Sequence, residues 1–458
     1  MASNSSSYTV IIIGAGLSGI IAAKTLHEAG TQDILILEAN GRIGGRLQTT
    51  QFAGHTIEMG ANWLVGGGPE CSHLYEIANQ LKLKTFFSDF QDISSNVYMQ
   101  EGGLYPQDVA DAAFEAAEAR DKFCNKLSNM LSSSSGKDGS DDNDISISDA
   151  QRLSEHVPTT PLEMVIDYFY YDYEDSQPPS FLDFGEETFF VADSRGFQSI
   201  GYYIASQFLS QEDGVIKDSR LKLNKVVKEI QYSDEGVKVK TEDGSIYQAK
   251  YAIVSVSVGV LQSDLIEFKP DLPQWKRLAV DNFQMAVFTK IFLKFPYKFW
   301  PSGPGTEFFI YAHERRGYYP IWQHLDNQLS GSNILFVTVT DEESKRIEQQ
   351  KDEKTQEEIM QVLRKMFGNN IPEPEGILVP KWWSNKFFKG SYSNWPKGYS
   401  EKRYEQLREP IGPIYFTGEH TNARYLGYAD AAYFAGIDTA TDVIKCLEEN
   451  CKPRSHMH

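Results

Sequence analysis

A glycine-rich hexapeptide near the start of the chain constrains its fold more than any other feature. The sequence GAGLSG, residues 14–19, follows one apolar run and opens a helical pattern. In such a turn Gly14 allows the tight bend, Gly16 lets a pyrophosphate approach the backbone, and Gly19 lets the helix pack against its strand. Phosphates then lie at the helix N-terminus, where unpaired N–H groups and the helix dipole favour anions. The order of strand, glycine turn and helix predicts a dinucleotide-binding unit.

An acidic residue at the end of the next apolar run narrows the choice of dinucleotide. Glu38 directly follows the run 34–37, about 20 residues after the glycine turn. At that position a carboxylate accepts hydrogen bonds from both ribose hydroxyls and repels a 2′-phosphate. FAD and NAD are therefore favoured over NADP.

The length and net charge of the chain limit the number of domains and the kinds of partner that we expect. A chain of 458 residues exceeds the size at which single cores stop growing, so we expect two or three domains. It carries 44 Lys and Arg against 63 Asp and Glu, a net charge of −19. Such a field repels nucleic acid and anionic membranes and attracts cations, although solubility alone also explains it. No apolar stretch reaches the roughly 20 residues that span a bilayer. Together with the negative charge, this leads us to expect neither nucleic acid nor membrane as a partner.

The cysteines and the N-terminal residues give expectations about metals and compartment. Cys71, Cys124, Cys446 and Cys451 have no metal-ligand spacing, so no metal site is expected and thiols are favoured, with a Cys446–Cys451 bridge left open. The N-terminus has neither the basic segment nor the long apolar segment of a signal peptide. We therefore expect a cytoplasmic monomer, or a secreted protein if the N-terminus has been processed or replaced.

Further apolar patterns outline the rest of the chain. Residues 221–261 alternate like strands, with the hairpin signal Asp243-Gly244 between two runs, and the run 252–258 is typical of a parallel strand. A helix is predicted over 106–131, followed by a polar surface loop at 132–144. Other predicted elements are strands at 291–295, 308–312, 334–339 and 414–419 and helices at 20–28, 355–367 and 430–448.

Several long blocks, in order along the chain, resemble the flavin-dependent amine oxidases, and among them the plant polyamine oxidases match nearly the whole chain. The blocks include GAGLSG, LILEANGRIGGR (35–46), IEMGANW (57–63), YDYE (171–174), FTKIFLKFPYKFWP (288–301), WWSNKFFKGSYSNWP (382–396) and IYFTGEHT (414–421). Their number and order make this signal far more specific than the hexapeptide alone.

The resemblance implies an α/β fold with two domains. One is a discontinuous, Rossmann-like FAD-binding domain of the glutathione-reductase type, and the other is an α+β substrate domain with a six-stranded mixed sheet flanked by helices. We expect the FAD-binding domain to comprise 1–82, 190–268 and 396–458, and the substrate domain to comprise 83–189 and 269–395.

The same resemblance implies FAD as the cofactor and a set of residues that hold it. Glu38 would bind the adenosine ribose, Arg46 the pyrophosphate, the Val227 backbone the adenine, and Glu419 the ribityl or pyrophosphate region. The expected contact set is Gly14, Ala15, Gly16, Gly19, Glu38, Ala39, Arg46, Gly60, Ala61, Val227, Trp382, Gly418 and Glu419.

The implied reaction is oxidation of a C–N bond beside the secondary amine of spermine, spermidine, thermospermine or norspermine. Hydride passes from carbon to flavin N5, the imine hydrolyses to an aminoaldehyde and an amine, and O2 is reduced to H2O2. Lys290 resembles the family lysine that contacts flavin N5 through a water, and Tyr428 and Tyr392 resemble the aromatic pair that faces the flavin. From the residues alone, a surface lysine and packed aromatic rings are the ordinary interpretations.

Substrate binding is expected from Glu174, Trp63, Val65, Phe288, Tyr392 and Asp430. Glu174 resembles a tunnel carboxylate for a distal ammonium, although a solvated loop acid fits it equally. Three positions depart from plant relatives: Val65 replaces a glutamate, Phe288 a tyrosine, and Asp430 a histidine. One acid is lost and another appears, so the identity of the amine is less secure than the oxidase chemistry.

Two alternatives therefore stand beside a polyamine oxidase. One is a divergent amine oxidase for another diamine or an alkaloid-type amine, and the other is a flavoprotein that binds polyamines with little turnover. A chromatin lysine demethylase is disfavoured because the chain is acidic and lacks a long partner-binding insert. A nicotinamide dehydrogenase is disfavoured because no second nucleotide fingerprint occurs.

Overall fold

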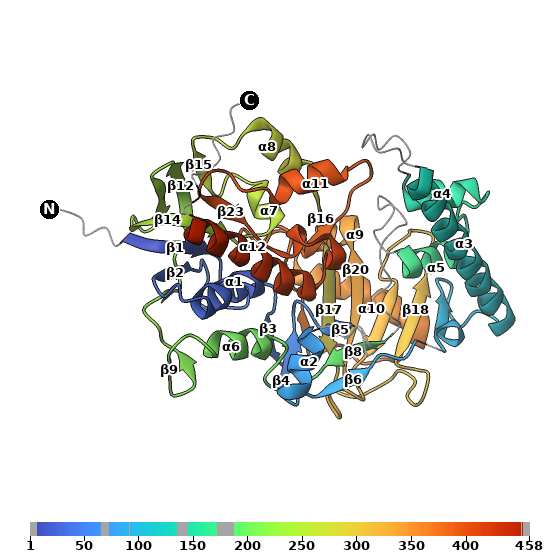
Figure 1. The fold of residues 1–458 in the computed structure, drawn as a ribbon. Helices are drawn as coiled ribbons and strands as arrows, with labels where there is room; N and C mark the ends of the chain where they lie inside the picture. Colours follow the sequence, from blue (N-terminus) through green and yellow to red (C-terminus); the bar gives the residue numbers. More distant parts are fainter. Residues whose placement is uncertain are drawn as a thin grey trace.

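Two large β-sheets, each covered by helices, organise the chain (Figure 1). The computed structural model describes residues 7–65, 73–90, 92–134, 145–171, 187–449 and 451.

The first sheet has eight strands and combines the two ends of the chain with its middle. Its order is β11-β2-β1-β14-β13-β12-β15, and β23 pairs with β14 where β13 no longer does. Strands β11, β2, β1, β14 and β23 run parallel, whereas β12, β13 and β14 form an antiparallel meander. The strands are β1 Ser7–Ile13, β2 Ile34–Leu37, β11 Leu221–Lys222, β12 Val227–Ser233, β13 Gly236–Thr241, β14 Ile246–Val254, β15 Glu267–Lys269 and β23 Ile414–Phe416.

Strand β1 is apolar throughout its second half because both faces of this sheet are covered. Val10 and Ile12 join one buried core, whereas Ile11 and Ile13 join the other, as the two-residue period of a strand requires. The first core includes α1 Leu17–Glu28, α6 Gln198–Ser206 and α12 Ala429–Glu449, and the second includes α7 Val258–Leu261, α8 Gln274–Asp281 and α11 Glu401–Arg408.

The C-terminal helix α12 packs directly on α1, so both ends of the chain build the same layer (Figure 1). The approach is close at Gly436, where a Cβ atom would lie 2.5 Å from the carbonyl oxygen of Ser18. A side chain there would push the two helices apart.

The second sheet has six strands in the order β21-β17-β20-β19-β18-β7. Neighbours are antiparallel except for β7 and β18, so the sheet is mixed, as predicted. Along β18 the side chains alternate between a core with α9 and α10 and a core with α3 and α5. The elements are β7 Val97–Met99, β17 Phe288–Lys294, β18 Phe308–Ala312, β19 Ile321–His324, β20 Ile334–Thr340, β21 Gly376–Leu378, α3 Gln107–Ser134, α5 Pro161–Tyr171, α9 Asp341–Glu348 and α10 Asp352–Phe367.

Short sheets and helices connect these two layers. Strands β3 and β4 form a hairpin, β5 pairs with β8 and β8 with β6, β9 pairs with β10, and β16 pairs with β22. Their bounds are β3 Thr49–Phe52, β4 His55–Glu58, β5 Trp63–Val65, β6 Thr85–Phe87, β8 Thr188–Val191, β9 Gln211–Glu212, β10 Val215–Ile216, β16 Gln284–Ala286, β22 Tyr392–Asn394, α2 His73–Gln80, α4 Ile147–Leu153 and the 3-10 turns Ile93–Asn96, Glu419–Thr421 and Ala423–Tyr425.

The predicted fold class is confirmed, whereas several predicted boundaries are wrong. The strand predicted over 414–419 ends at Phe416, and Glu419 begins a 3-10 turn. The Asp243-Gly244 turn joins β13 to β14 as expected. Helix α3 continues to Ser134, so the polar loop predicted over 132–144 is wrong for residues 132–134, and residues 135–144 lie outside the described part. The strand predicted over 252–258 ends at Val254, because the Ser257 hydroxyl accepts a hydrogen bond from the Val260 N–H and caps α7. The domain boundaries themselves stay a prediction.

Within the described residues, no helix combines the length and apolarity needed to cross a membrane. The same residues contain no group of three or more His, Cys, Asp and Glu side chains arranged to hold a metal ion.

Candidate active site

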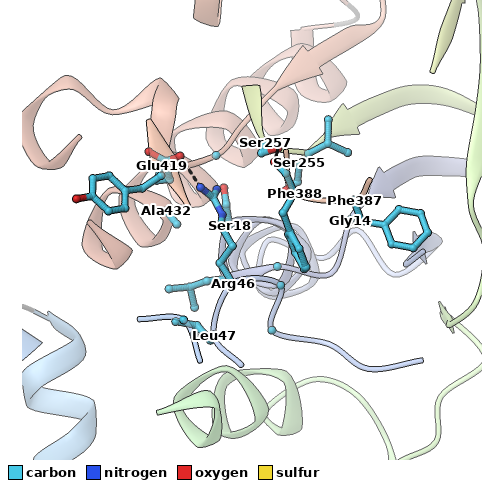
Figure 2. Close-up of a pocket in the computed structure, with 18 of the residues that line it drawn as sticks. Gly14, Ser18, Arg46, Leu47, Ser255, Ser257, Phe387, Phe388, Glu419 and Ala432 are labelled. Carbon is cyan, nitrogen blue, oxygen red and sulfur yellow. Dashed lines mark hydrogen bonds and ion pairs between the residues drawn. The ribbon is translucent and has the colours of Figure 1, made fainter. Parts of the chain in front are cut away.

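A cavity of about 450 Å³ collects most of the predicted site residues from segments far apart in the sequence (Figure 2). Ala15, Gly19 and Asp430 are not among the described residues that line it, and Glu174 lies outside the described part. The predicted residues in its lining are Gly14, Gly16, Glu38, Ala39, Arg46, Gly60, Ala61, Trp63, Val65, Val227, Phe288, Lys290, Trp382, Tyr392, Gly418, Glu419 and Tyr428.

The glycine turn forms one wall of the cavity, and it leaves no room for a side chain at Gly14 or Gly19. Gly14 has a φ of +107°, and a Cβ atom there would lie 2.6 Å from the Ser255 carbonyl oxygen. A Cβ atom at Gly19 would lie 2.1 Å from the Gly14 carbonyl oxygen. Gly16 caps α1 without a side-chain hydrogen bond, so the first turn of the helix presents backbone N–H groups at the cavity. This cradle fits a pyrophosphate.

The Glu38 carboxylate is held in place at the end of β2. It is 5% exposed. Its Oε2 accepts a hydrogen bond from the Ala15 N–H at 2.7 Å, and its Oε1 accepts from the backbone and side-chain N–H groups of Asn40 at 2.8 and 2.9 Å. Ala15 therefore orients Glu38 and does not line the cavity itself. The fixed carboxylate suits a ribose diol.

Arg46 and Glu419 form an ion pair across the cavity that joins residues 373 positions apart. Arg46 Nη1 lies 2.9 Å from Glu419 Oε1 and also donates to the Ser391 carbonyl oxygen at 3.1 Å. Burial would raise the pKa of Glu419, but the charge of Arg46 and the Ser393 hydroxyl outweigh it and lower that pKa overall. Figure 2 shows the Arg46 side chain directed at Glu419, so its cation is partly neutralised before any phosphate binds.

Lys290 is a buried lysine on β17, and the interpretation of a surface lysine is wrong for it. It is 2% exposed, and its Nζ donates to the Gly60 carbonyl oxygen at 3.0 Å and to Asn62 Oδ1 at 2.8 Å. The same Nζ lies 5.2 Å from the centre of the Trp63 ring. Burial lowers the pKa of Lys290 well below that of an exposed lysine, and the charge of Glu58 partly opposes this. The neutral amine is therefore accessible near neutral pH.

Glu58 and Asn62 complete this buried group and were not predicted. Glu58 is 5% exposed, and its Oε1 accepts from the Phe197 N–H at 2.6 Å. Burial raises the pKa of Glu58, whereas that hydrogen bond and Lys290 lower it. Both residues stand in the IEMGANW block that carries the family resemblance. The sequence signal that could have identified Glu58 and Asn62 is the presence of polar residues inside an otherwise apolar block.

Aromatic side chains from four segments form another part of the lining. Trp63 lies on β5, Phe288 begins β17 and Tyr392 begins β22. The Phe288 and Tyr392 rings lie 6.3 Å apart, and Tyr428 is 42% exposed, so it adjoins solvent. Trp382 is buried and donates its indole N–H to the Met59 carbonyl oxygen at 3.2 Å.

The three positions that depart from plant relatives have different places in the structure. Val65 and Phe288 both line the cavity. Asp430 is only 8% exposed, and its Oδ1 accepts a hydrogen bond from the Leu74 N–H at 3.5 Å. The structure therefore joins Asp430 to α2 and does not bring it into the described lining.

Comparisons with known proteins identify the family. The chain matches the family of flavin containing amine oxidoreductases over residues 17–444. It is 52% identical to polyamine oxidase 1 of Zea mays and 52% identical to polyamine oxidase 6 of Oryza sativa subsp. japonica, each over 97% of this chain and 92% of the relative. The structure of putrescine oxidase bound to putrescine superposes with a TM-score of 0.73 at 18% identity, covering 96% of this chain and 99% of that one, which supports the fold. The chain belongs to the flavin containing amine oxidoreductases and is an FAD-dependent oxidoreductase.

Proposed function

We propose that the chain is a polyamine oxidase that cleaves a C–N bond beside the secondary amine of spermine, spermidine or a close relative. The observation that carries this proposal is a single cavity that joins the glycine turn to the buried Lys290 and the aromatic lining. The two plant relatives that share 52% identity are named polyamine oxidases, which supports a polyamine as the substrate.

The residues at one part of the cavity fit FAD. The uncapped N-terminus of α1 suits the pyrophosphate and the fixed carboxylate of Glu38 suits the ribose. Val227, the first residue of β12, also lines the cavity. When bound, FAD accepts a hydride from the carbon beside the amine nitrogen and passes two electrons to O2, giving H2O2.

The chain's own residues bind the amine, orient it and handle protons. Aromatic faces hold an extended aliphatic amine and attract its cationic groups. We assign this role to Trp63, Phe288 and Tyr392, and we place Tyr428 against the reacting groups. The substrate nitrogen must lose its proton before the C–N bond is oxidised, because an ammonium has no lone pair to stabilise the developing iminium. Lys290, with its lowered pKa, can accept a proton inside the cavity and return it during hydrolysis of the imine.

The choice of amine is set by the cavity wall near Val65. Because a valine offers no charge to a distal ammonium, that ammonium must be held by water, by aromatic faces or by an acid elsewhere. This observation favours one second candidate, a divergent amine oxidase for a diamine or an alkaloid-type amine. A flavoprotein with little turnover is the remaining alternative.

A panel of amines with detection of released H2O2 separates these candidates. We expect turnover of spermine or spermidine to exceed that of putrescine and of aromatic amines. Faster turnover of a diamine would favour the divergent oxidase, and turnover of every amine several orders of magnitude below ordinary enzyme rates would favour the binding protein. Mass identification of the amine product, 1,3-diaminopropane or a shorter polyamine, gives the carbon that is oxidised. Light scattering after gel filtration tests the expected monomer.

A further inference from the structure

The Glu348 carboxylate, at the last residue of α9, binds four donors from one short segment. Its Oε1 accepts from the backbone N–H groups of Trp382 and Trp383 at 2.9 and 3.0 Å. Its Oε2 accepts from the backbone N–H and the hydroxyl of Ser384 at 2.8 and 2.7 Å. Glu348 is 6% exposed, so water does not compete strongly for these bonds. Bonds of this charge-assisted kind are about twice as strong as neutral ones.

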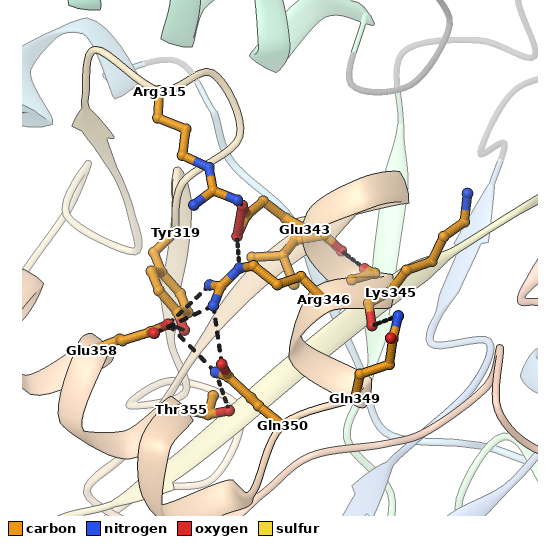
Figure 3. A network of polar contacts seen from close by, with 11 residues as sticks. Arg315, Tyr319, Glu343, Lys345, Arg346, Gln349, Gln350, Thr355 and Glu358 are labelled. Atoms are coloured by element: carbon orange, nitrogen blue, oxygen red, sulfur yellow. Dashed lines mark hydrogen bonds and ion pairs between the residues drawn. The ribbon is translucent and has the colours of Figure 1, made fainter.

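Helix α9 is itself fixed, so Glu348 projects from a rigid support. Arg346 donates to Glu343 Oε2 at 2.9 Å and to Glu358 Oε2 of α10 at 2.8 Å (Figure 3). The Tyr319 hydroxyl donates to the same Glu358 at 2.8 Å. Ile347 is fully buried in the core of the six-stranded sheet. These contacts hold the end of α9 while Glu348 holds the segment 382–384.

Trp382 transmits this position to the lysine site. Its indole N–H donates to the Met59 carbonyl oxygen, and a Cβ atom at Gly60 would lie 3.3 Å from its ring atom Cζ2. The Gly60 carbonyl oxygen is one of the two acceptors that fix Lys290 Nζ. A shift of Trp382 would therefore move the backbone that anchors Lys290.

We propose that Glu348 is a positioning residue for amine oxidation, because it fixes the 382–384 backbone and so sets Trp382 against the Met59–Gly60 backbone that anchors Lys290. Glu348 is not among the described residues that line the cavity, so we assign its effect to the position of Trp382. The kinetic consequences of this inference rest on the proposed function. The expected contact of Trp382 with FAD does not depend on which amine is oxidised.

The test is Glu348→Gln in the FAD-loaded protein. The substitution keeps the size of the side chain but turns one acceptor oxygen into an NH2 group that faces donors. We expect kcat with spermine to fall at least about tenfold, because small misplacements of a reacting geometry have large kinetic effects, while KM changes by less than about threefold. The visible circular dichroism of bound FAD should also change. Glu307→Gln is the matched control: Glu307 is 8% exposed, accepts two side-chain amide bonds at 2.7 Å and does not line the cavity.

A double-variant cycle with Trp382→Phe shows whether Glu348 acts through Trp382. We expect Glu348→Gln to slow the Trp382→Phe variant by less than about twofold. The proposal would be overturned if the kcat losses of the two single variants multiplied in the double variant. It would also be overturned if Glu348→Gln left the circular dichroism of FAD unchanged. If Glu348→Gln does not fold, Ser384→Ala serves instead, because it removes one of the four donors to Glu348. We expect Ser384→Ala to change the circular dichroism of FAD, but less than Glu348→Gln would. No change would again contradict the proposal. Wild-type protein with normal FAD dichroism but no amine oxidation would reject the proposed function instead.

Discussion

Replacing Lys290 by methionine separates the chemical role of the lysine from its structural role. Lys290→Met keeps an unbranched side chain but removes the donor to the Gly60 carbonyl oxygen and to Asn62 Oδ1. Two buried acceptors left without a partner cost about 1–3 kcal/mol each. Removal of a buried charge returns several kcal/mol of desolvation free energy. Because these contributions oppose each other, we expect the free energy of unfolding to change by less than about 2 kcal/mol.

The kinetic effect of the same variant should be much larger than its effect on stability. A positioned proton-transfer group contributes about 10²–10⁴-fold to a rate, which equals about 2.7–5.4 kcal/mol of activation free energy. We therefore expect FAD to be retained while kcat falls by that factor. The wild-type rate should rise with pH as Lys290 loses its proton, at a lower pH than an exposed lysine requires, because burial lowers the pKa of Lys290. The variant should lack that ionisation.

Stopped-flow absorbance under anaerobic and aerobic conditions measures reduction and reoxidation of the flavin separately. The control is Lys294→Met on the same strand, where the lysine side chain is 19% exposed, lies 3.5 Å from Glu375 and does not line the cavity. Unchanged reduction and reoxidation in Lys290→Met would refute the role of the lysine. An equal loss in Lys294→Met would show that the effect is not specific to the site.

Three further substitutions test other parts of the structure. Gly19→Ala places a Cβ atom 2.1 Å from the Gly14 carbonyl oxygen, so the purified variant should have lost its yellow flavin absorbance; full FAD content would contradict the cradle. Val65→Glu adds a carboxylate to the cavity wall, and a hydrated ion pair of about 1 kcal/mol should lower KM for spermine about fivefold; an unchanged or higher KM would remove Val65 from the substrate path. Lys276→Met removes three hydrogen bonds of 2.6–3.1 Å to carbonyl groups at the end of α11, so urea unfolding should show a loss of about 1–3 kcal/mol with kcat of the folded protein unchanged.

The cofactor cradle could be predicted from the sequence because its signals are local. Gly14, Gly16 and Gly19 stand at fixed spacing in one turn, and Glu38 ends the neighbouring strand. Each of these residues acts within one strand-turn-helix unit, whose geometry follows from the backbone requirements of the turn. The structure confirms that no Cβ atom fits at Gly14 or Gly19.

The polar pairs of the site could not be predicted because they join distant segments. Arg46 and Glu419 were each expected to bind the cofactor, but no pairing between them was predicted, and in the structure they form an ion pair. Burial of Glu58 beside the lysine site likewise depends on Phe197, which no local pattern connects to it. Which side chains meet is decided by the tertiary packing of segments far apart in the chain, and a single sequence carries little of that information.

The prediction for Asp430, made from its neighbours in the sequence, placed its side chain wrongly. Asp430 was expected to bind substrate because it replaces a histidine of plant relatives, two residues after Tyr428, which does line the cavity. However, α12 begins at Ala429, and successive residues of a helix are rotated by about 100°. Asp430 is therefore directed at the N–H of Leu74, whereas Tyr428 precedes the helix and lines the cavity.

Anaerobic titration of the purified protein with spermine tests the central claim most directly. If the chain is an FAD-dependent polyamine oxidase, the yellow flavin absorbance should bleach stoichiometrically with added spermine. It should return when O2 is admitted, with release of one H2O2 for each two electrons transferred. A protein without flavin absorbance, or one whose absorbance does not change with spermine, spermidine or thermospermine, would contradict the account.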